Sequence, residues 1–181
     1  MKATVIAVVG SKRSGKTTTV EALVRELAKK GHKIAAIKHI SEQKFTIDTK
    51  GKDTWRYAQA GAQTVIGISA TELATIEKAN KTFSLEDILE RSQGHDFVFL
   101  EGFKKLVSKE KNIPKIVVVK SQNEAQEAAT AYRPIIAFAG PYSTENLHLE
   151  APYVDALKNP ARLARIVEAF VSKNRQKSRS A

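Results

Sequence analysis

One short segment near the amino terminus constrains the fold of this chain more than any other. Residues 10–17, GSKRSGKT, match the pattern G-x-x-x-x-G-K-[ST], with Gly10, Gly15, Lys16 and Thr17 at the fixed positions. In such a loop the glycines let the backbone turn tightly and approach phosphate oxygens closely. The loop N–H groups and the positive end of the next helix then face the phosphates. The pattern therefore predicts a phosphate-binding loop.

The segments on either side of this loop have the periodicity that it requires. Residues 5–9 are a short apolar, β-branched run, typical of a buried parallel strand. After the loop, Val20, Leu23, Val24 and Leu27 follow the spacing of one helical face. The strand–loop–helix context is therefore present. The residues expected to bind the phosphates of a nucleoside triphosphate are Gly10, Ser11, Arg13, Ser14, Gly15, Lys16, Thr17 and Thr18.

Two of these residues have more specific expected roles. The Lys16 ammonium would reach the β- and γ-phosphates and so take part in catalysis as well as in binding. The Thr17 hydroxyl would be a ligand of Mg²⁺. The expected cofactors are thus a nucleoside triphosphate and Mg²⁺.

Strands and helices alternate along the rest of the chain, which predicts a three-layer α/β fold of the P-loop NTPase class, with a mostly parallel sheet flanked by helices. No linker is long enough to divide the chain, so residues 1–172 are expected to form a single domain. Residues 173–181 are polar and basic, and we predict a disordered tail there. Further strands are expected near residues 33–40, 63–69, 72–77, 96–100, 115–119 and 134–139.

Composition narrows the classes of partner. The net charge of +11 favours phosphate-bearing ligands, although four of these charges lie in the expected tail. Nucleic acid is not expected, because no zinc-finger, recognition-helix or aromatic-interleaved basic pattern is present. The absence of cysteine excludes disulfides and thiolate chemistry. No apolar run reaches the length of a membrane span and the amino terminus shows no signal-peptide pattern, so we expect a cytoplasmic protein without membrane partners.

A second acidic element should complete the metal site. The segment DFVFLE offers Asp96 at the start of a strand and Glu101 at its end, roughly 16 Å apart at 3.3 Å per residue. Ligands of open parallel sheets bind at the carboxyl ends of the strands. We therefore predict that Glu101 and Thr17 serve Mg²⁺, directly or through a metal-bound water, and that Asp96 lies at the far rim.

Five segments in order resemble the MobB family, the molybdopterin-guanine dinucleotide biosynthesis adaptor proteins. They are GSKRSGKTTTVEALVREL, IAAIKHI, FTIDTKGKDTWRYAQAGAQTV, DFVFLEGFKK and IPKIVVV, and the resemblance covers residues 3–140. It implies a homodimeric protein that binds GTP and hydrolyses it slowly. Such a protein assists a separate guanylyltransferase, which acts on a phosphate-bearing pterin cofactor. Any enzymatic activity of the chain itself would be at most that of a slow GTPase.

The resemblance also suggests roles outside the loop. Asp48 follows the second strand, where related NTPases carry a switch-like acid, and it could orient the attacking water. Its alternative is an Asx-turn residue before Thr49. Lys38 and His39 end the second strand and could either face a phosphate-bearing partner or merely cap the sheet edge.

One expected motif is missing. Many GTPases select guanine with N/T-K-x-D, and this chain lacks that tetrapeptide; Glu145 and Asn146 are weak substitutes. The assignment of GTP is therefore supported only by the resemblance, whereas the loop itself supports the binding of a nucleoside triphosphate. Two alternatives stay open: an ATP-dependent ligase or small-molecule kinase related to dethiobiotin synthetase, and a non-enzymatic module that holds a pterin phosphate or nucleic acid.

Overall fold

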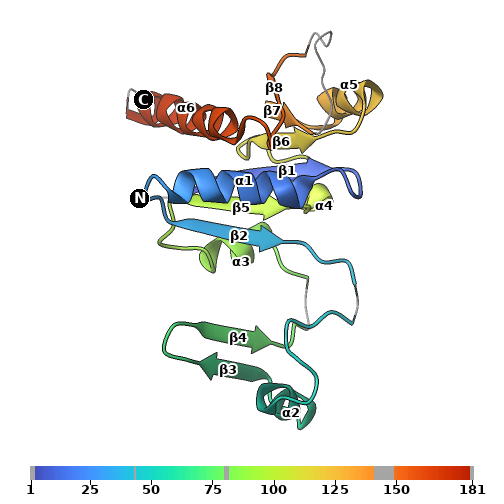
Figure 1. Cartoon of the computed structure of the whole chain (residues 1–181), viewed down its shortest axis with the longest axis vertical. Coiled ribbons are helices and arrows are strands. Elements are labelled where there is room, and N and C mark those ends of the chain that lie inside the picture. Colours follow the sequence, from blue (N-terminus) through green and yellow to red (C-terminus); the bar gives the residue numbers. More distant parts are fainter. Residues whose placement is uncertain (1–2, 43, 80–81, 141–148, 180–181) are drawn as a thin grey trace. The chain divides into compact units, whose positions relative to one another are not determined.

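The computed structural model of this chain describes residues 3–42, 44–79, 82–140 and 149–179 (Figure 1). They form two compact units, Met1–His39 with Leu85–Ala181 and Ile40–Ser84. The sequence predicted a single domain over residues 1–172. The strands within residues 40–84 pair with each other and not with the main sheet, and the single domain stays a prediction.

The first unit is built on a six-stranded sheet in which every pairing is parallel, in the order β2-β5-β1-β6-β7-β8. This confirms the predicted α/β class. The chain leaves β1 for β2 on one side and later reaches β6 on the other, so β1 lies where the strand order reverses. The strands are β1 (Thr4–Gly10), β2 (Ile34–Lys38), β5 (Phe97–Glu101), β6 (Lys115–Val118), β7 (Ile135–Ala139) and β8 (Tyr153–Val154).

Helices cover both faces of this sheet, which gives the three predicted layers (Figure 1). The alternation of side chains along β1 sends Ile6 and Val8 to one face and Ala7 and Val9 to the other. On the first face pack α1 (Lys16–Ala28) and α6 (Pro160–Arg179). On the second face pack α3 (Leu85–Glu90), α4 (Lys104–Val107) and α5 (Gln122–Ala131). No helix among the described residues is long and apolar enough to cross a membrane.

The second unit is a small antiparallel hairpin with one helix. Strands β3 (Thr64–Ile68) and β4 (Leu73–Glu77) pair in register, and α2 (Asp53–Gln59) precedes them. The Cβ that Gly67 lacks would lie 3.7 Å from Thr54 of α2, so the helix approaches this face of the hairpin. The opposite face carries exposed apolar side chains, including Ile66, Ile68 and Leu73.

The observed ends of the elements show what periodicity can and cannot predict. The strands expected from apolar runs are all present, whereas α4 and β8 were not predicted because each has four residues or fewer. The α6 helix continues to Arg179, so residues 173–179, predicted as a disordered tail, are helical. No glycine or proline follows Pro160 to end that helix, and its Lys, Arg and Gln residues are good helix formers. Glu145 and Asn146 lie outside the described residues.

Candidate functional site

The glycine-rich loop joins the carboxyl end of β1 to the amino end of α1, as its pattern requires. A Cβ on Gly10 would lie 2.2 Å from the Val118 carbonyl oxygen, so only glycine allows the loop to leave the sheet this close to β6. Arg13 (φ 58°) and Gly15 (φ 96°) adopt left-handed conformations, and Gly15 is the N-cap of α1. The tight turn expected from the sequence is therefore present, at the sheet end where parallel folds bind ligands.

Two serine hydroxyls inside this loop have no hydrogen-bond partner among the described residues, which is what a site built for an additional ligand would show. Ser14 is only 2% exposed, and its Oγ is buried without any hydrogen bond. The Oγ of Ser11 is also buried without a hydrogen bond of normal geometry to a described residue, although it lies close enough to Glu124 to help lower the pKa of that carboxyl. Buried polar groups normally have partners. These hydroxyls and the loop conformation therefore fit a polyanion that accepts hydrogen bonds from the loop.

Lys16 is held within the loop itself. Its Nζ donates a hydrogen bond to the Ser11 carbonyl oxygen at 2.6 Å, which leaves further donors of the ammonium for an external group. Burial lowers the pKa of Lys16 below its ordinary value, and the Glu101 carboxylate opposes this shift. Three neighbouring lysines lower it further: Lys104, Lys38 and Lys120. Several positive charges thus gather around one half-buried ammonium, and an anion would relieve their repulsion.

Thr17 and Glu101 meet as the sequence predicted. The Thr17 hydroxyl donates to Glu101 Oε1 at 2.9 Å, although 84 residues separate them. Neighbouring oxygens in an octahedral Mg²⁺ site, with ligands at about 2.1 Å, are about 3 Å apart. The pair therefore fits two adjacent positions of such a site. Among the described residues no cluster of three or more histidine or acidic side chains could hold a metal alone, so the remaining ligands would be water and phosphate oxygens.

Lys38 is the residue whose place the sequence left open. Its Nζ lies 3.2 Å from Thr17 Oγ1 and 3.2 Å from Glu101 Oε1, so it contacts both expected metal ligands. The adjacent His39 donates its backbone N–H to the Glu101 carbonyl oxygen and packs its ring edge-on against Phe103. The signal in the sequence was that both β2 and β5 end on a charged residue, but the neighbouring positions of these strands are not readable from one sequence.

Asp96 lies at the opposite end of β5 from Glu101. Its Oδ2 accepts the backbone N–H of Lys33 at 2.8 Å and lies 3.9 Å from His32 Nδ1. These partners belong to the turn that follows α1, at the amino end of the sheet. The predicted separation of the two acids is thus observed, with Glu101 the one beside the loop.

Asp48 belongs to the second unit, and its described contacts are local. Its Oδ1 accepts the Thr49 N–H at 2.8 Å and the Thr54 hydroxyl at 2.9 Å, whereas its Oδ2 is buried without a partner. The first two contacts hold the turn before α2. They agree with the turn alternative, and the role in orienting water stays a prediction.

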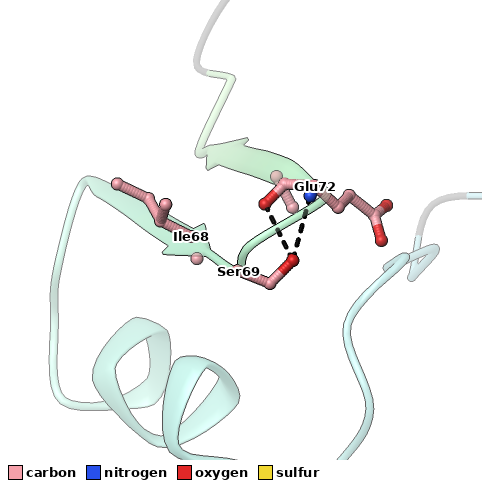
Figure 2. Close-up of a pocket in the computed structure, with 5 residues that line it drawn as sticks. Ile68, Ser69 and Glu72 are labelled. Carbon is pink, nitrogen blue, oxygen red and sulfur yellow. Dashed lines mark hydrogen bonds between the residues drawn. The ribbon is translucent and has the colours of Figure 1, made fainter.

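A shallow hollow in the second unit lies at the turn of the β3–β4 hairpin (Figure 2). Ser69 Oγ accepts the Glu72 N–H at 2.9 Å and donates to the Glu72 carbonyl oxygen at 3.2 Å. These bonds close the turn. The hollow therefore reflects turn geometry and brings none of the predicted site residues together.

Comparison with known proteins identifies the family whose features the chain shares. The family model described as molybdopterin guanine dinucleotide synthesis protein B, MobB, matches residues 5–141. A Methanocaldococcus jannaschii protein, named as a candidate molybdopterin-guanine dinucleotide biosynthesis adapter protein, is 42% identical over 66% of this chain and 48% of its own length. The Haemophilus influenzae molybdopterin-guanine dinucleotide biosynthesis adapter protein is 33% identical over 62% of this chain and 61% of its own length.

Solved structures agree on the fold. A crystal structure of molybdopterin-guanine biosynthesis protein B matches 93% of this chain and 99% of its own with a TM-score of 0.70 and 24% identity. The crystal structure of Bacillus subtilis MobB matches 90% and 97% with a TM-score of 0.69, also at 24% identity. At this identity the likeness shows the fold alone. The sequence matches, in turn, span only about half to three fifths of the first two relatives.

Proposed function

The chain belongs to the MobB family, and on this premise we propose that it is a GTP-binding adapter protein in molybdopterin guanine dinucleotide biosynthesis. The observation that carries the nucleotide part is the contact between Thr17 Oγ1 and Glu101 Oε1 beside the loop. The names of the Methanocaldococcus and Haemophilus relatives support the adapter part. Nothing in the loop itself distinguishes GTP from ATP, so the choice of guanine as the base is supported only by membership of the family.

Each loop residue has a physical task in this proposal. The Lys16 ammonium, with spare donors and three lysines around it, would hold the terminal phosphates. Ser14 and Ser11, whose hydroxyls are buried without partners, would donate to phosphate oxygens. Thr17 and Glu101 would hold Mg²⁺, which neutralises triphosphate charge when bound. Gly10 keeps the backbone close to β6, and the loop N–H groups can therefore face the phosphates.

Calorimetric titration of the purified protein with GTP and ATP, each with and without Mg²⁺, tests the nucleotide part. We expect both nucleotides to bind, more tightly with Mg²⁺, and GTP to be preferred only modestly because no N/T-K-x-D carboxylate reads the guanine edge. A preference above about a thousandfold, about 4 kcal/mol, would reveal a base-reading group outside the residues named above. Stronger binding of ATP than of GTP would favour the ligase or kinase alternative.

The adapter role requires partners, and these are proposals from the family. We propose a homodimer that serves a separate molybdopterin guanylyltransferase and its phosphate-bearing pterin. Multi-angle light scattering should give the mass of two chains at micromolar concentration. The dinucleotide product should form faster when this protein is added to the transferase, and a transferase indifferent to it would contradict the adapter role.

Hydrolysis of GTP is expected to be slow. We retain Asp48 as the candidate for orienting water on the family resemblance alone. Asp48→Asn should lower the hydrolysis rate while leaving GTP affinity unchanged. If the variant instead loses thermal stability and keeps its hydrolysis rate, Asp48 serves only the turn before α2.

A further inference from the structure

One ammonium group lies against both oxygens proposed to hold Mg²⁺. Lys38 Nζ is 3.2 Å from Thr17 Oγ1 and 3.2 Å from Glu101 Oε1, and these two oxygens are 2.9 Å apart. The three atoms form a nearly equilateral triangle. A divalent cation that contacted the same two oxygens would lie in the space next to this ammonium, and the two positive charges would repel each other strongly at such a distance.

The register of the sheet fixes this contact. Lys38 is the last residue of β2 and Glu101 the last residue of β5, and the two are Cα partners in a parallel pair. Their side chains therefore leave the sheet at the same level of its carboxyl end, β2 being the edge strand and β5 its only neighbour in the sheet (Figure 1). Thr17 reaches the pair from the first turn of α1. The fold thus places Lys38 beside both oxygens, and the Nζ at the end of its side chain makes the contact.

The Lys38 ammonium compensates the negative charge of the buried Glu101 carboxylate. Glu101 is only 8% exposed, and a carboxylate buried to this degree needs compensation. Lys38 supplies the only ion pair that Glu101 makes among the described residues. The Lys38 side chain is itself 53% exposed, so its ammonium can move into water. It is therefore a counter-ion that can be displaced.

We propose that Lys38 is the built-in competitor of Mg²⁺ at the Thr17–Glu101 pair, and that its ammonium must move away before the metal contacts these oxygens. This inference rests on the proposed function, since it takes Thr17 and Glu101 as the metal ligands. Its consequence is that a divalent cation alone binds the protein weakly. Nucleotide phosphates offer the ammonium another acceptor, and metal binding therefore becomes dependent on nucleotide.

Binding of Mn²⁺, which has the oxygen preference of Mg²⁺ and is detected by electron paramagnetic resonance, tests this directly. The nucleotide-free full chain is titrated as wild type, as Lys38→Met and as Lys104→Met. Lys104 is the matched control because it also lies close enough to lower the pKa of Lys16, yet no described hydrogen bond or ion pair joins it to Thr17 or Glu101. Both variants lose one positive charge, so the general electrostatic effect on Mn²⁺ affinity is the same in both. A difference in their Mn²⁺ affinities therefore measures the competition between the Lys38 ammonium and the metal.

We expect Lys38→Met to bind Mn²⁺ about tenfold more tightly than Lys104→Met, about 1.4 kcal/mol. Lys38→Arg, which keeps a cation at this position, should bind as weakly as the wild type. Equal affinities for Lys38→Met and Lys104→Met, or weaker binding by Lys38→Met, would overturn the inference. Circular dichroism of each variant establishes that it is folded.

A fourth variant separates this inference from the proposed function. Glu101→Gln is titrated with Mn²⁺ in the presence of GTP, where the proposed function expects weaker metal binding. If Glu101→Gln loses metal affinity while Lys38→Met behaves like Lys104→Met, the metal position is right and the competition is wrong. If Glu101→Gln binds Mn²⁺ like the wild type, the metal position itself is wrong, and the inference falls with it.

Discussion

At the amino end of the central sheet, the charged side chains pair with one another, whereas at the carboxyl end the Lys38–Glu101 ion pair lies beside a loop with buried hydroxyls that make no hydrogen bond to any described residue. Lys30 Nζ lies 2.6 Å from Glu168 Oε2, and His32 bridges towards Glu168 and Asp96 at 3.5 and 3.9 Å. At the other end, the Oγ of Ser14 has no partner. The two ends thus differ in unmet hydrogen-bonding capacity and not in the presence of charge, and the end with unmet capacity is where we propose the binding site.

Lys16, which is half-buried, and Lys115, which is buried, allow the same comparison between two residues of one type. Burial lowers the pKa of both Lys16 and Lys115. Lys115, which is fully buried at the start of β6, donates to the carbonyl oxygens of Glu110 and Arg133. Lys16 has one carbonyl acceptor and three lysines around it. A lowered pKa is thus common to Lys115 and to Lys16, for which we propose phosphate binding, and their partners distinguish the two lysines.

The largest expected effect is on nucleotide affinity at the carboxyl end. Lys16→Ala should weaken GTP binding at least about a hundredfold, about 2.7 kcal/mol, because it removes charge-assisted hydrogen bonds to the phosphates. The free energy of unfolding should change little, since the ammonium has only one protein acceptor. Calorimetry and urea unfolding of the same preparation measure both quantities. Undiminished affinity in a folded variant would remove the loop from the binding site.

The second largest effect is expected for glycine substitutions, which should lower stability and GTP affinity more at the carboxyl end of the sheet than at the amino end. Gly10→Ala would place a Cβ 2.2 Å from the Val118 carbonyl oxygen and 2.7 Å from Ser14 Oγ, so the loop must shift. We expect a loss of roughly 1–3 kcal/mol in unfolding free energy, together with reduced GTP affinity.

Gly31→Ala is the control at the amino end. A Cβ there meets nothing within 4 Å, although φ is +82°, so only the left-handed strain of roughly 1 kcal/mol applies. Its GTP affinity should equal that of the wild type. Two variants with identical affinity would show that the loop tolerates a side chain at Gly10.

Lys115→Met should act on stability alone. Methionine fills a similar volume but leaves the Glu110 and Arg133 carbonyl oxygens without this donor, which should lower the unfolding free energy by about 2 kcal/mol. GTP affinity should not change. A more stable variant would mean that burying the ammonium costs more than its two hydrogen bonds return.

The smallest expected effect is at Asp96. Asp96→Ala removes the acceptor of the Lys33 N–H, and we expect a loss of about 1 kcal/mol in unfolding free energy. Asp96→Asn keeps an acceptor oxygen and should lose less. Thermal denaturation of the two variants measures the difference, and equal losses would assign the effect to the charge facing His32.

The sequence predicted the geometry around the loop where a motif also determines the local structure, whereas the binding role of these residues stays a prediction. The loop, its strand and its helix follow from spacing and periodicity, and the choice of Glu101 over Asp96 follows from strand direction. The contact of Lys38 with Thr17 and Glu101 did not follow. It depends on which strands are neighbours and on their register, and three segments far apart in the chain contribute to it.

The fold shows the same division. Apolar runs predicted the strands, but they did not reveal that β3 and β4 pair only with each other, because alternation is the same in a hairpin and in a larger sheet. The helical continuation of α6 was missed because polar composition was taken as disorder. Asp48 was placed by resemblance, and its described partners are those of a turn.

The most direct test sets the two ends of β5 against each other. GTP affinity is measured with and without Mg²⁺ for Glu101→Gln and Asp96→Asn, with circular dichroism establishing that both are folded. Glu101 contacts Thr17 beside the loop, whereas Asp96 accepts a backbone N–H at the other end of the strand. We predict that Glu101→Gln removes most of the gain in affinity that Mg²⁺ provides, and that Asp96→Asn keeps it. Equal Mg²⁺ dependence in the two variants, or its loss only in Asp96→Asn, would contradict a metal site at the carboxyl end of the sheet.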